Sequence, residues 1–246
     1  MKIIGVIPAR YKSTRLEGKP LVDIHGKPMI QHVYEAAQKA LTLDRIIVAT
    51  DDERVSEAVR RFGGAFMMTN PGHSCGTDRV AEVAAASDAD IIVNVQGDEP
   101  LMDPRMIDEC VAALRDNTEV GMSTVIKKIG EAAYQDLAVV KVVRDTRGRA
   151  LYFSRSLIPF PRHRTEDFEV FEHIGLYAYT RDCLVRFSQL APTPLEKIEG
   201  LEQLRALENG IAIQTVETRC PGELVSVDTP EDLCRVREIL AYGALS

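Results

Sequence analysis

Short apolar runs alternate with segments of helical periodicity through the first half of the chain. Strands that alternate with helices predict βαβ units, and continuous apolar strands fit a mainly parallel sheet covered by helices on both faces. The apolar runs predicted to be strands are 3–7, 45–50, 65–69 and 90–95. The segments with helical spacing are 29–41, 53–62, 78–86 and 103–114.

The second half of the chain has a different pattern, in which strand-like segments lie closer together. We therefore predict one α/β domain spanning 1–246, with a smaller inserted lobe at about 130–210 and a return to the main sheet near the C-terminus. A polar, proline-containing segment at 158–171 is predicted to be a loop. The predicted strands are 120–126, 139–144, 150–153, 173–179 and 211–216. The predicted helices are 180–190, 194–209 and 229–240.

The composition indicates a soluble protein of the cytoplasm. The formal net charge is −7, whereas nucleic-acid and membrane-surface binders usually carry a basic surface, so we expect neither partner. No apolar run reaches the roughly 18 residues that span a membrane. The five cysteines are odd in number and form no C-x-x-C pair, which favours free thiols in a reducing compartment.

A basic segment follows the first predicted strand and contains Arg10, Lys12, Arg15 and Lys19. In open α/β sheets, ligands bind at the carboxyl ends of the strands, which is where this segment should lie. Arg10, Arg15 and Lys19 could neutralise a triphosphate there, and arginine suits phosphate geometry. The chain has neither a G-x-x-x-x-G-K-[ST] nor a G-x-G-x-x-G motif, so side-chain cations are expected to hold the phosphates. The alternative is a solvated basic loop.

Asp98 follows the fourth predicted strand, within Val93-Asn94-Val95-Gln96-Gly97-Asp98-Glu99-Pro100. It should therefore share a sheet edge with the basic segment, where one or two carboxylates and phosphate oxygens can hold Mg²⁺. Gly97 would let the backbone pass close to a ligand. A turn-capping aspartate is the alternative. The D-x-D pair Asp88 and Asp90 precedes its strand and is expected at the opposite edge, so we reject it as the metal site.

A second candidate metal ligand is Asp228, in Ser226-Val227-Asp228-Thr229-Pro230-Glu231-Asp232-Leu233. Thr229, Pro230 and Asp232 have the pattern of a capped helix start, which accounts for their residue types. That role leaves Asp228, just before the cap, available to join Asp98.

These motifs, in this order, closely resemble the 3-deoxy-manno-octulosonate cytidylyltransferase family, the CMP-Kdo synthetases, over nearly the whole chain. Such a resemblance implies a Rossmann-like nucleotidyltransferase fold and the reaction CTP + Kdo → CMP-Kdo + pyrophosphate. It also implies Mg²⁺ and a cytosolic homodimer that supplies lipopolysaccharide synthesis. The segments that carry it include 7–10, 13–16, 18–21, 26–30, 48–51, 76–79, 94–100, 152–155, 173–177, 201–205 and 227–233.

The resemblance also implies roles for particular side chains. The triphosphate would contact Arg10, Arg15 and Lys19, and the metal Asp98 and Asp228. The nucleotide would also contact Ala9, Arg79 and Gln96. The acidic sugar would contact Arg155, His173, Tyr177, Glu202 and Gln203, and the inserted lobe at about 130–210 would serve acceptor binding and dimerisation. A cation such as Arg155 suits the carboxylate of that sugar.

Two positions depart from the family pattern near the predicted pocket. Cys75 stands where a small hydroxyl or other small residue is more frequent, and Ser226 stands where a glycine usually precedes Val-Asp-Thr-Pro. They bear on the nucleotide loop and on the choice of acceptor, so a related acidic sugar, including an amino-substituted Kdo, or UTP in place of CTP, is an alternative. A nucleotide-binding regulator without catalysis is another, although such a protein would be free to lose Asp98 or Asp228.

Overall fold

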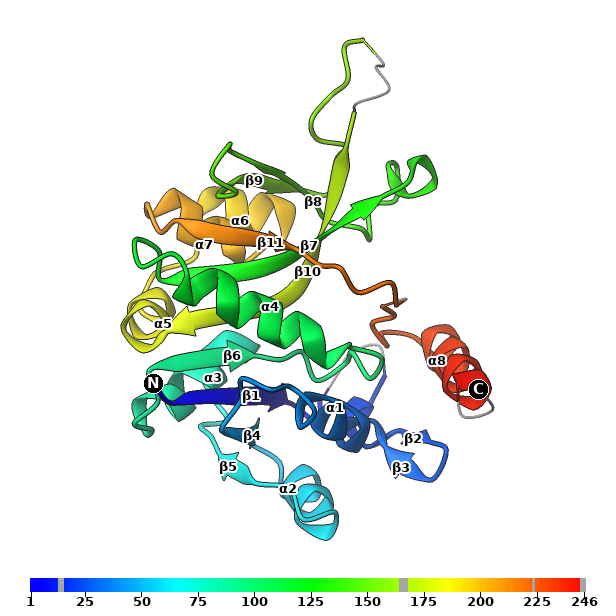
Figure 1. Cartoon of the computed structure of the whole chain (residues 1–246). Coiled ribbons are helices and arrows are strands. Elements are labelled where there is room, and N and C mark those ends of the chain that lie inside the picture. The colour runs from blue at the N-terminus through cyan, green and yellow to red at the C-terminus, as the bar shows by residue number, and fades with distance from the viewer. Residues whose placement is uncertain (13–15, 164–167, 223, 244–246) are drawn as a thin grey trace. The chain divides into compact units, whose positions relative to one another are not determined.

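The computed structural model describes residues 1–12, 16–163, 168–222 and 224–243 (Figure 1). The chain divides into two units. Unit 1 comprises Met1–Asp108 and Cys220–Ser246, and unit 2 comprises Glu109–Arg219. Unit 2 contains the whole of the segment 130–210 that the sequence pattern marks as a lobe, and the chain re-enters unit 1 after it.

Unit 1 is built on four parallel strands in the order β6-β1-β4-β5. Val6 of β1 is in register with Ile47 of β4 on one side and with Asn94 of β6 on the other. The strands β1, β4 and β6 are almost entirely buried, because both faces of the sheet are covered. The strand bounds are β1 Ile3–Ala9, β4 Arg45–Thr50, β5 Phe66–Met68 and β6 Ile91–Asn94.

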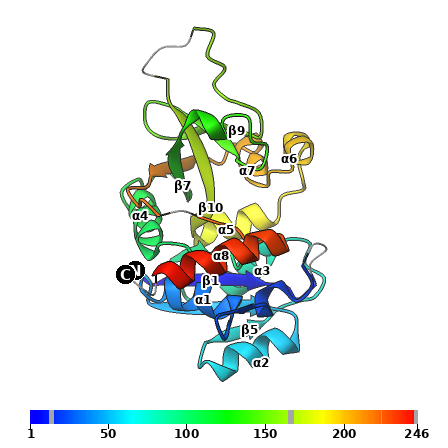
Figure 2. The ribbon, with the colours of Figure 1, turned by 90° about the vertical axis from the view of Figure 1, so that its right-hand side faces the viewer.

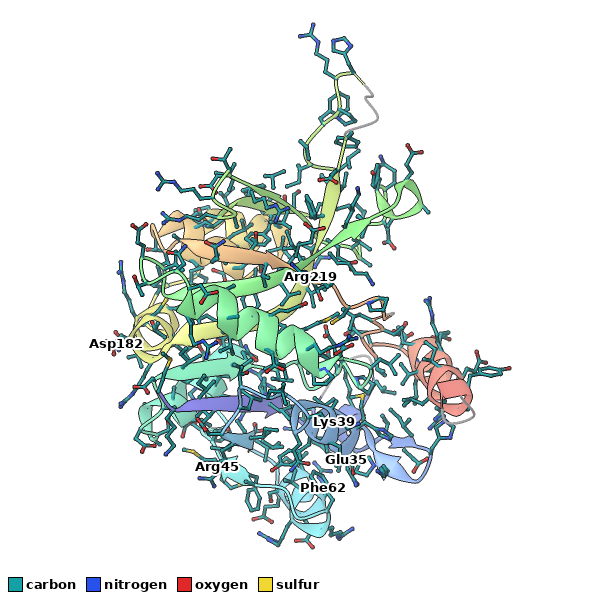
Figure 3. All side chains as sticks on the ribbon, in the orientation of Figure 1. Glu35, Lys39, Arg45, Phe62, Asp182 and Arg219 are labelled. Atoms are coloured by element: carbon teal, nitrogen blue, oxygen red, sulfur yellow. The ribbon has the colours of Figure 1, made fainter. Side chains whose placement is uncertain are left out.

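Helices follow these strands, as the alternating pattern predicts. The carboxylate of Asp52 caps the start of α2 by accepting from the backbone N–H of Arg54 at 2.9 Å. Figure 3 shows the side chain of Glu35 on α1, where its carboxylate accepts from Lys27 and Gln31. The helices of unit 1 are α1 Met29–Ala37, α2 Glu53–Arg61, α3 Gly76–Ala85 and α8 Pro230–Gly243, with the short 3-10 helix η1 at Lys19–Leu21.

A small hairpin, which the periodicity does not predict, connects η1 to α1. Its strands are β2, Asp23–Ile24, and β3, Lys27–Pro28. Ile24 and Met29 pack there against Leu233 and Val236 of α8. This cluster holds α8 against the rest of unit 1, and Figure 2 shows the helix beside α1.

Unit 2 has a mixed sheet. Strand β10 pairs antiparallel with β7 and, near its start, with β8, while β11 runs parallel to β7 and β9 antiparallel to β8. The strands are β7 Met122–Ile129, β8 Lys141–Arg144, β9 Ala150–Ser154, β10 Val170–Thr180 and β11 Ile213–Glu217. The helices are α5 Arg181–Ser188, α6 Pro194–Glu199 and α7 Gln203–Glu208, with the 3-10 turn η2 at Glu131–Ala133 and α4, Pro104–Arg115, crossing from unit 1.

The structure confirms the predicted α/β class with mostly parallel strands flanked by helices in unit 1, but it corrects the segment 194–209. Two helices stand where one continuous helix was predicted, because Gly200 adopts a left-handed conformation (φ 66°) that ends α6. Strand β10 also begins at Val170, inside the predicted loop. Among the described residues, no helix combines the length and the apolar character that crossing a membrane requires.

Candidate active site

A cavity of about 420 Å³ opens at the carboxyl ends of β1 and β6. It is lined by residues from the loop after each of these strands and from the start of α3. A larger open groove of about 1460 Å³ lies along α2, but no predicted site residue that the structure describes lines it. The smaller cavity therefore holds the candidate site. Its lining includes Pro8, Ala9, Arg10, Lys12, Lys19, Cys75, Gly76, Gln96, Gly97 and Asp98.

The backbones of the β1 and β6 loops meet in this cavity at Gly97. A Cβ atom at position 97 would lie 2.7 Å from the carbonyl oxygen of Pro8, closer than side chains approach backbone. The parallel pairing brings these loops together, since Val95 still donates its N–H to the carbonyl of Val6 at 2.9 Å. The close approach of the two backbones therefore requires glycine at position 97. Its neighbours Gln96 and Asp98 also line the cavity.

Tyr11 orders the end of the basic loop. Its carbonyl accepts from the N–H of Gly18 at 3.0 Å, and its ring packs over Gly18, which has a left-handed conformation (φ 68°). The Arg54 guanidinium lies 3.3 Å from the centroid of the same ring. These contacts set the start of η1 and thereby the position of Lys19.

The ammonium of Lys19 joins the two predicted metal ligands. Its Nζ lies 2.6 Å from Oδ2 of Asp98 and 2.8 Å from Oδ1 of Asp228. Burial lowers the pKa of Lys19, but the two carboxylates outweigh that effect, so its pKa lies above the ordinary value. Two carboxylates far apart in the sequence therefore converge on one cation.

Asp228 owes its position to the start of α8. Oδ2 of Asp232 accepts from the N–H groups of Asp228 and Thr229, at 3.0 and 2.9 Å, and the Thr229 hydroxyl accepts from the N–H of Asp232 at 3.2 Å. This capping box satisfies the helix start with Thr229 and Asp232 alone. The Asp228 carboxylate is left to face Lys19, as the sequence pattern predicts.

The pair of carboxylates fits a magnesium ion bound together with a nucleotide. Mg²⁺ usually takes one or two protein carboxylates and completes its shell with phosphate oxygens and water. Asp98 and Asp228 already hold one cation between them, which meets that requirement. Within the described ranges, no cluster of three or more His, Cys, Asp or Glu residues forms a self-sufficient protein cage.

Arg10 contributes a guanidinium donor that has no partner among the residues that the structure describes. Its Nη2 is buried and makes no hydrogen bond to any residue that the structure describes, while the residue lines the cavity. A buried guanidinium nitrogen without an acceptor is costly, and a phosphate oxygen in the cavity would satisfy it. Lys12 lines the same cavity and was not assigned a role from sequence. Arg15, the third predicted phosphate ligand, lies outside the described residues.

Arg79 has a different environment from the cavity-lining residues. Its side chain is 1% exposed, and it donates to Oδ2 of Asp51 at 2.6 Å and to the Thr69 hydroxyl at 2.7 Å. It does not line the cavity. The network ties α3 to the loops after β4 and β5, while Cys75 and Gly76, at the start of α3, face the cavity. Contact between Arg79 and the nucleotide remains a prediction.

The residues predicted to bind the acceptor all belong to unit 2, and two of them lie in a row of rings. His173 contacts Phe153 edge-on at 5.0 Å between centroids and Tyr177 at 5.3 Å, and Tyr177 stacks on Tyr179 at 5.8 Å. A bulge in β10 between Ile174 and Tyr177 interrupts the strand pairing. It places His173 and Tyr177 close together although four positions separate them.

The protonation of His173 follows from its partner. The Thr124 hydroxyl donates to the carbonyl oxygens of Leu176 and Ile174, at 2.9 and 3.2 Å, so His173 Nε2 must donate to Thr124 Oγ1 at 3.1 Å. Burial lowers the pKa of His173 to about 3. The imidazole is therefore neutral with its proton on Nε2, which leaves Nδ1 as a hydrogen-bond acceptor.

Glu202 and Gln203 lie at the start of α7. Arg205 donates to Glu202 at 3.2 Å and makes a shorter ion pair with Glu196 of α6 at 2.5 Å. Gln203 is 5% exposed, and its Nε2 is buried without a hydrogen-bond partner within the described part of the chain. An amide donor in that state is suited to a ligand oxygen.

Arg155 follows β9 and is held by backbone carbonyls. Its Nε donates to the carbonyl of Glu199 at 3.1 Å and its Nη1 to that of Leu137 at 2.9 Å. In the described part of the chain, the two bonds use two of the five guanidinium donors, which leaves three for an anion. Sequence reasoning found Arg155 but missed Glu199, Leu137 and Thr124, because no motif marks residues that act through backbone atoms or through a single hydroxyl.

The parallel sheet of unit 1 brings cations, two carboxylates and a close backbone turn to one edge, which is the arrangement of an α/β nucleotide-binding protein. Comparison with known proteins narrows the class. Residues 4–215 match the family model described as cytidylyltransferase, and the chain belongs to that family.

Two relatives that match this chain over nearly its whole length have the same name. A protein of Geobacter metallireducens named 3-deoxy-manno-octulosonate cytidylyltransferase is 53% identical over 98% of both chains. A protein of Solibacter usitatus with the same name is 54% identical and covers 99% of this chain and 96% of its own.

Solved structures agree with the family. The structure of CMP:2-keto-3-deoxy-manno-octonic acid synthetase complexed with CTP is 46% identical, with a TM-score of 0.94 over 99% of this chain and 100% of its own. A 4-diphosphocytidyl-2C-methyl-D-erythritol synthase of Anaerococcus prevotii, at 14% identity and a TM-score of 0.64 over 98% of this chain and 99% of its own, shares the fold.

Proposed function

We propose that this protein transfers CMP from CTP to the anomeric hydroxyl of 3-deoxy-D-manno-octulosonate (Kdo), giving CMP-Kdo and pyrophosphate for lipopolysaccharide biosynthesis. The observation that carries the proposal is the likeness, over essentially the whole chain, to 3-deoxy-manno-octulosonate cytidylyltransferases and to a CTP-bound CMP-Kdo synthetase structure. The site in unit 1 has the charges that this reaction needs.

The nucleotide is assigned to the cavity at the β1 and β6 ends. Arg10, Arg15 and Lys19 neutralise the triphosphate, and the unsatisfied Nη2 of Arg10 supports that role. Ala9 and Gln96 line the same cavity and are assigned to nucleotide binding, together with Arg79. In this assignment, Lys19 exchanges carboxylate contacts for phosphate contacts when the nucleotide enters.

Asp98 and Asp228 are assigned to Mg²⁺. When bound, the ion would neutralise charge on the phosphates and on the leaving pyrophosphate. The protein's own contribution is to hold the triphosphate and the acceptor hydroxyl in line, because phosphoryl-type transfer depends mainly on positioning and charge stabilisation. The oxygen of the hydroxyl forms a bond to the α-phosphorus, the bond to the β-phosphate oxygen breaks, and the hydroxyl proton leaves to solvent.

The acceptor is assigned to the polar groups of unit 2. The three remaining donors of Arg155 suit the sugar carboxylate, while neutral His173 and the unpartnered Nε2 of Gln203 suit its hydroxyls. Tyr177 and Glu202 complete the predicted set. The burial of His173 argues against a role as a cation or as a general base.

We further assign the enzyme to the cytoplasm, as a homodimer. Several large apolar side chains of unit 2 are exposed, including Leu151 at 60%, Phe160 at 82% and Ile198 at 79%. A second copy covering such side chains would remove apolar surface from water. Light scattering of the purified protein tests this assignment, and a monomer at micromolar concentration contradicts it.

The reaction is tested by pyrophosphate release from the purified protein with Mg²⁺ and each of CTP, UTP, ATP and GTP, with and without Kdo. Release that requires both CTP and Kdo is the expected result. If CTP gives release only with another acidic sugar, such as an amino-substituted Kdo, that sugar is the acceptor in place of Kdo. A folded protein that binds CTP and releases pyrophosphate under no condition contradicts the enzymatic function and favours a nucleotide-binding regulator.

A further inference from the structure

Lys141, the first residue of β8, is a fully buried lysine in unit 2. Its side chain is 0% exposed, and Nζ donates to the carbonyl oxygens of Val139 and Arg155, both at 2.9 Å, and also to that of Asp136. These bonds use all three ammonium donors. Within the described ranges, these bonds are all to backbone carbonyls, and the ammonium makes no ion pair with a carboxylate.

A cation in this position is not explained by packing. Burying an ammonium without an ion-pair partner is costly: burial lowers the pKa of Lys141, and the more distant carboxylates of Asp136 and Glu172 offset that effect only in part. An apolar side chain of similar length would fill the same space without that cost. The three carbonyl bonds are therefore the specific contribution of this residue.

Those bonds fix the surroundings of Arg155. Two of the carbonyls, from Asp136 and Val139, lie on either side of Leu137, and the third belongs to Arg155 itself. The carbonyl of Leu137 accepts from Arg155 Nη1 at 2.9 Å. Lys141 thus fixes the distance between the backbone of Arg155 and the segment that contains Leu137, whose carbonyl accepts from the Arg155 guanidinium.

Glu199, the last residue of α6, holds Arg155 from a second direction. Its carboxylate accepts from the Ser154 hydroxyl at 2.7 Å and from the N–H of Arg155 at 3.1 Å. Its carbonyl accepts from Arg155 Nε at 3.1 Å. The left-handed Gly200 follows directly and leads toward Gln203, so the same residue links Arg155 to the start of α7.

We propose that Lys141 and Glu199 are positioning residues that present the free donors of Arg155 to the carboxylate of the acidic sugar. The inference rests on the proposed function, because it takes Arg155 as the residue that binds the acceptor. Neither residue contacts substrate in this assignment. Their effect passes through the Arg155 guanidinium, whose orientation they set.

The first test compares Lys141→Met with Lys128→Met, both assayed for the KM of Kdo, the KM of CTP and kcat. Lys128 lies on β7 and makes an exposed ion pair with Glu169, so its replacement serves as the matched control. We expect Lys141→Met to raise the KM of Kdo by about 10-fold or more, because a small displacement of a binding group greatly weakens its interaction with the ligand. The KM of CTP should stay within about twofold of the wild-type value, and Lys128→Met should change neither.

Glu199→Gln provides a second variant if Lys141→Met fails to fold. It retains an acceptor oxygen but loses one of the two carboxylate contacts, and we expect the same selective rise in the KM of Kdo. A purely structural role predicts instead a lower melting temperature and a smaller active fraction, with both KM values unchanged. That result in a folded variant overturns the proposal.

Arg155→Ala separates this inference from the proposed function. If Arg155→Ala raises the KM of Kdo and Lys141→Met adds little in that background, the two residues act through one group, as proposed. If Arg155→Ala raises the KM of Kdo while Lys141→Met and Glu199→Gln do not, the positioning inference is wrong and the Arg155 assignment stands. If Arg155→Ala leaves the KM of Kdo unchanged, the assignment of Arg155 to the acceptor is itself wrong.

Discussion

The backbone N–H of Val227 donates a hydrogen bond to the carbonyl oxygen of Asp98 at 2.9 Å. This bond joins the loop after β6 to the residue before Asp228, and so sets the two candidate metal ligands beside each other. Val227 itself is fully buried in the cluster that attaches α8 to unit 1. The packing of the C-terminal helix therefore contributes directly to the geometry of the site.

Replacing Asp98 with asparagine should abolish turnover while the fold survives. The variant keeps the size and the backbone bond of Asp98 but removes half of the carboxylate pair that faces Lys19. We expect kcat to fall on the order of 100-fold or more, the scale reported for loss of a preorganised electrostatic group. Pyrophosphate release measures the effect, and circular dichroism checks the fold.

Asp88→Asn is the control for this substitution. Asp88 precedes β6 at the opposite sheet edge and forms an ion pair with Lys2. Activity should stay close to wild type, which would also exclude the D-x-D pair as the metal site. Near-normal turnover in a folded Asp98→Asn protein would contradict the assignment of Asp98.

Lys19→Met should make the stability of the nucleotide-free protein more dependent on Mg²⁺. Without the ammonium, the carboxylates of Asp98 and Asp228 repel each other, so a divalent cation that binds between them gains affinity. Ligand binding raises the free energy of unfolding by RT ln(1 + [L]/Kd), so tighter binding gives a larger shift. Thermal unfolding with and without 5 mM Mg²⁺ should show a larger increase in Tm for Lys19→Met than for wild type, and equal increases would argue against a shared cation site.

Gly97→Ala should destabilise the protein and weaken CTP binding. The added methyl group would lie 2.7 Å from the Pro8 carbonyl oxygen, so the β1 and β6 loops must move apart. Such overpacking costs about 1–3 kcal/mol in free energy of unfolding. Gly130→Ala is the matched control, because a Cβ there meets nothing within 4 Å and its φ of −87° suits alanine. Urea denaturation and CTP titration of both variants test the prediction, which fails if the two behave alike.

His173 should make the folded protein less stable as the pH falls from 7.5 to 5. The pKa of His173 is lowered to about 3 in the fold, against about 6.5 when unfolded. Between these values the unfolded chain binds a proton that the folded chain does not, so the free energy of unfolding decreases as pH decreases. We expect a contribution of about 1–2 kcal/mol over this interval, which His173→Gln should remove.

His163→Gln is the control for His173→Gln, because the His163 side chain is exposed, and urea denaturation between pH 5 and 7.5 compares both variants with wild type. Identical pH dependence in wild type and His173→Gln would show that His173 is not buried in its neutral form. The hydrogen bond to Thr124 would then need a different assignment of the ring proton.

The sequence alone was sufficient for the class of the fold and for much of the nucleotide site. Continuous apolar strands and helical spacing are local signals, and strand order along a parallel sheet places the segments after β1 and β6 at one edge. Arg10, Lys19, Gln96 and Asp98 could therefore be predicted to meet. The capping pattern at Thr229 explains its neighbours but not Asp228, and so marked Asp228 as a candidate metal ligand.

Tertiary structure decided what no local pattern carries. Gly200 ends α6 because of a backbone conformation that helical periodicity does not register, and Lys141 lies buried because three carbonyls from separate positions surround its ammonium. The neutral state of His173 depends on a hydroxyl of a neighbouring strand. Residue type and spacing indicated which polar groups gather at the sheet edge of unit 1. Burial and backbone hydrogen bonds, which exist only in the folded chain, decided how polar groups are charged and oriented.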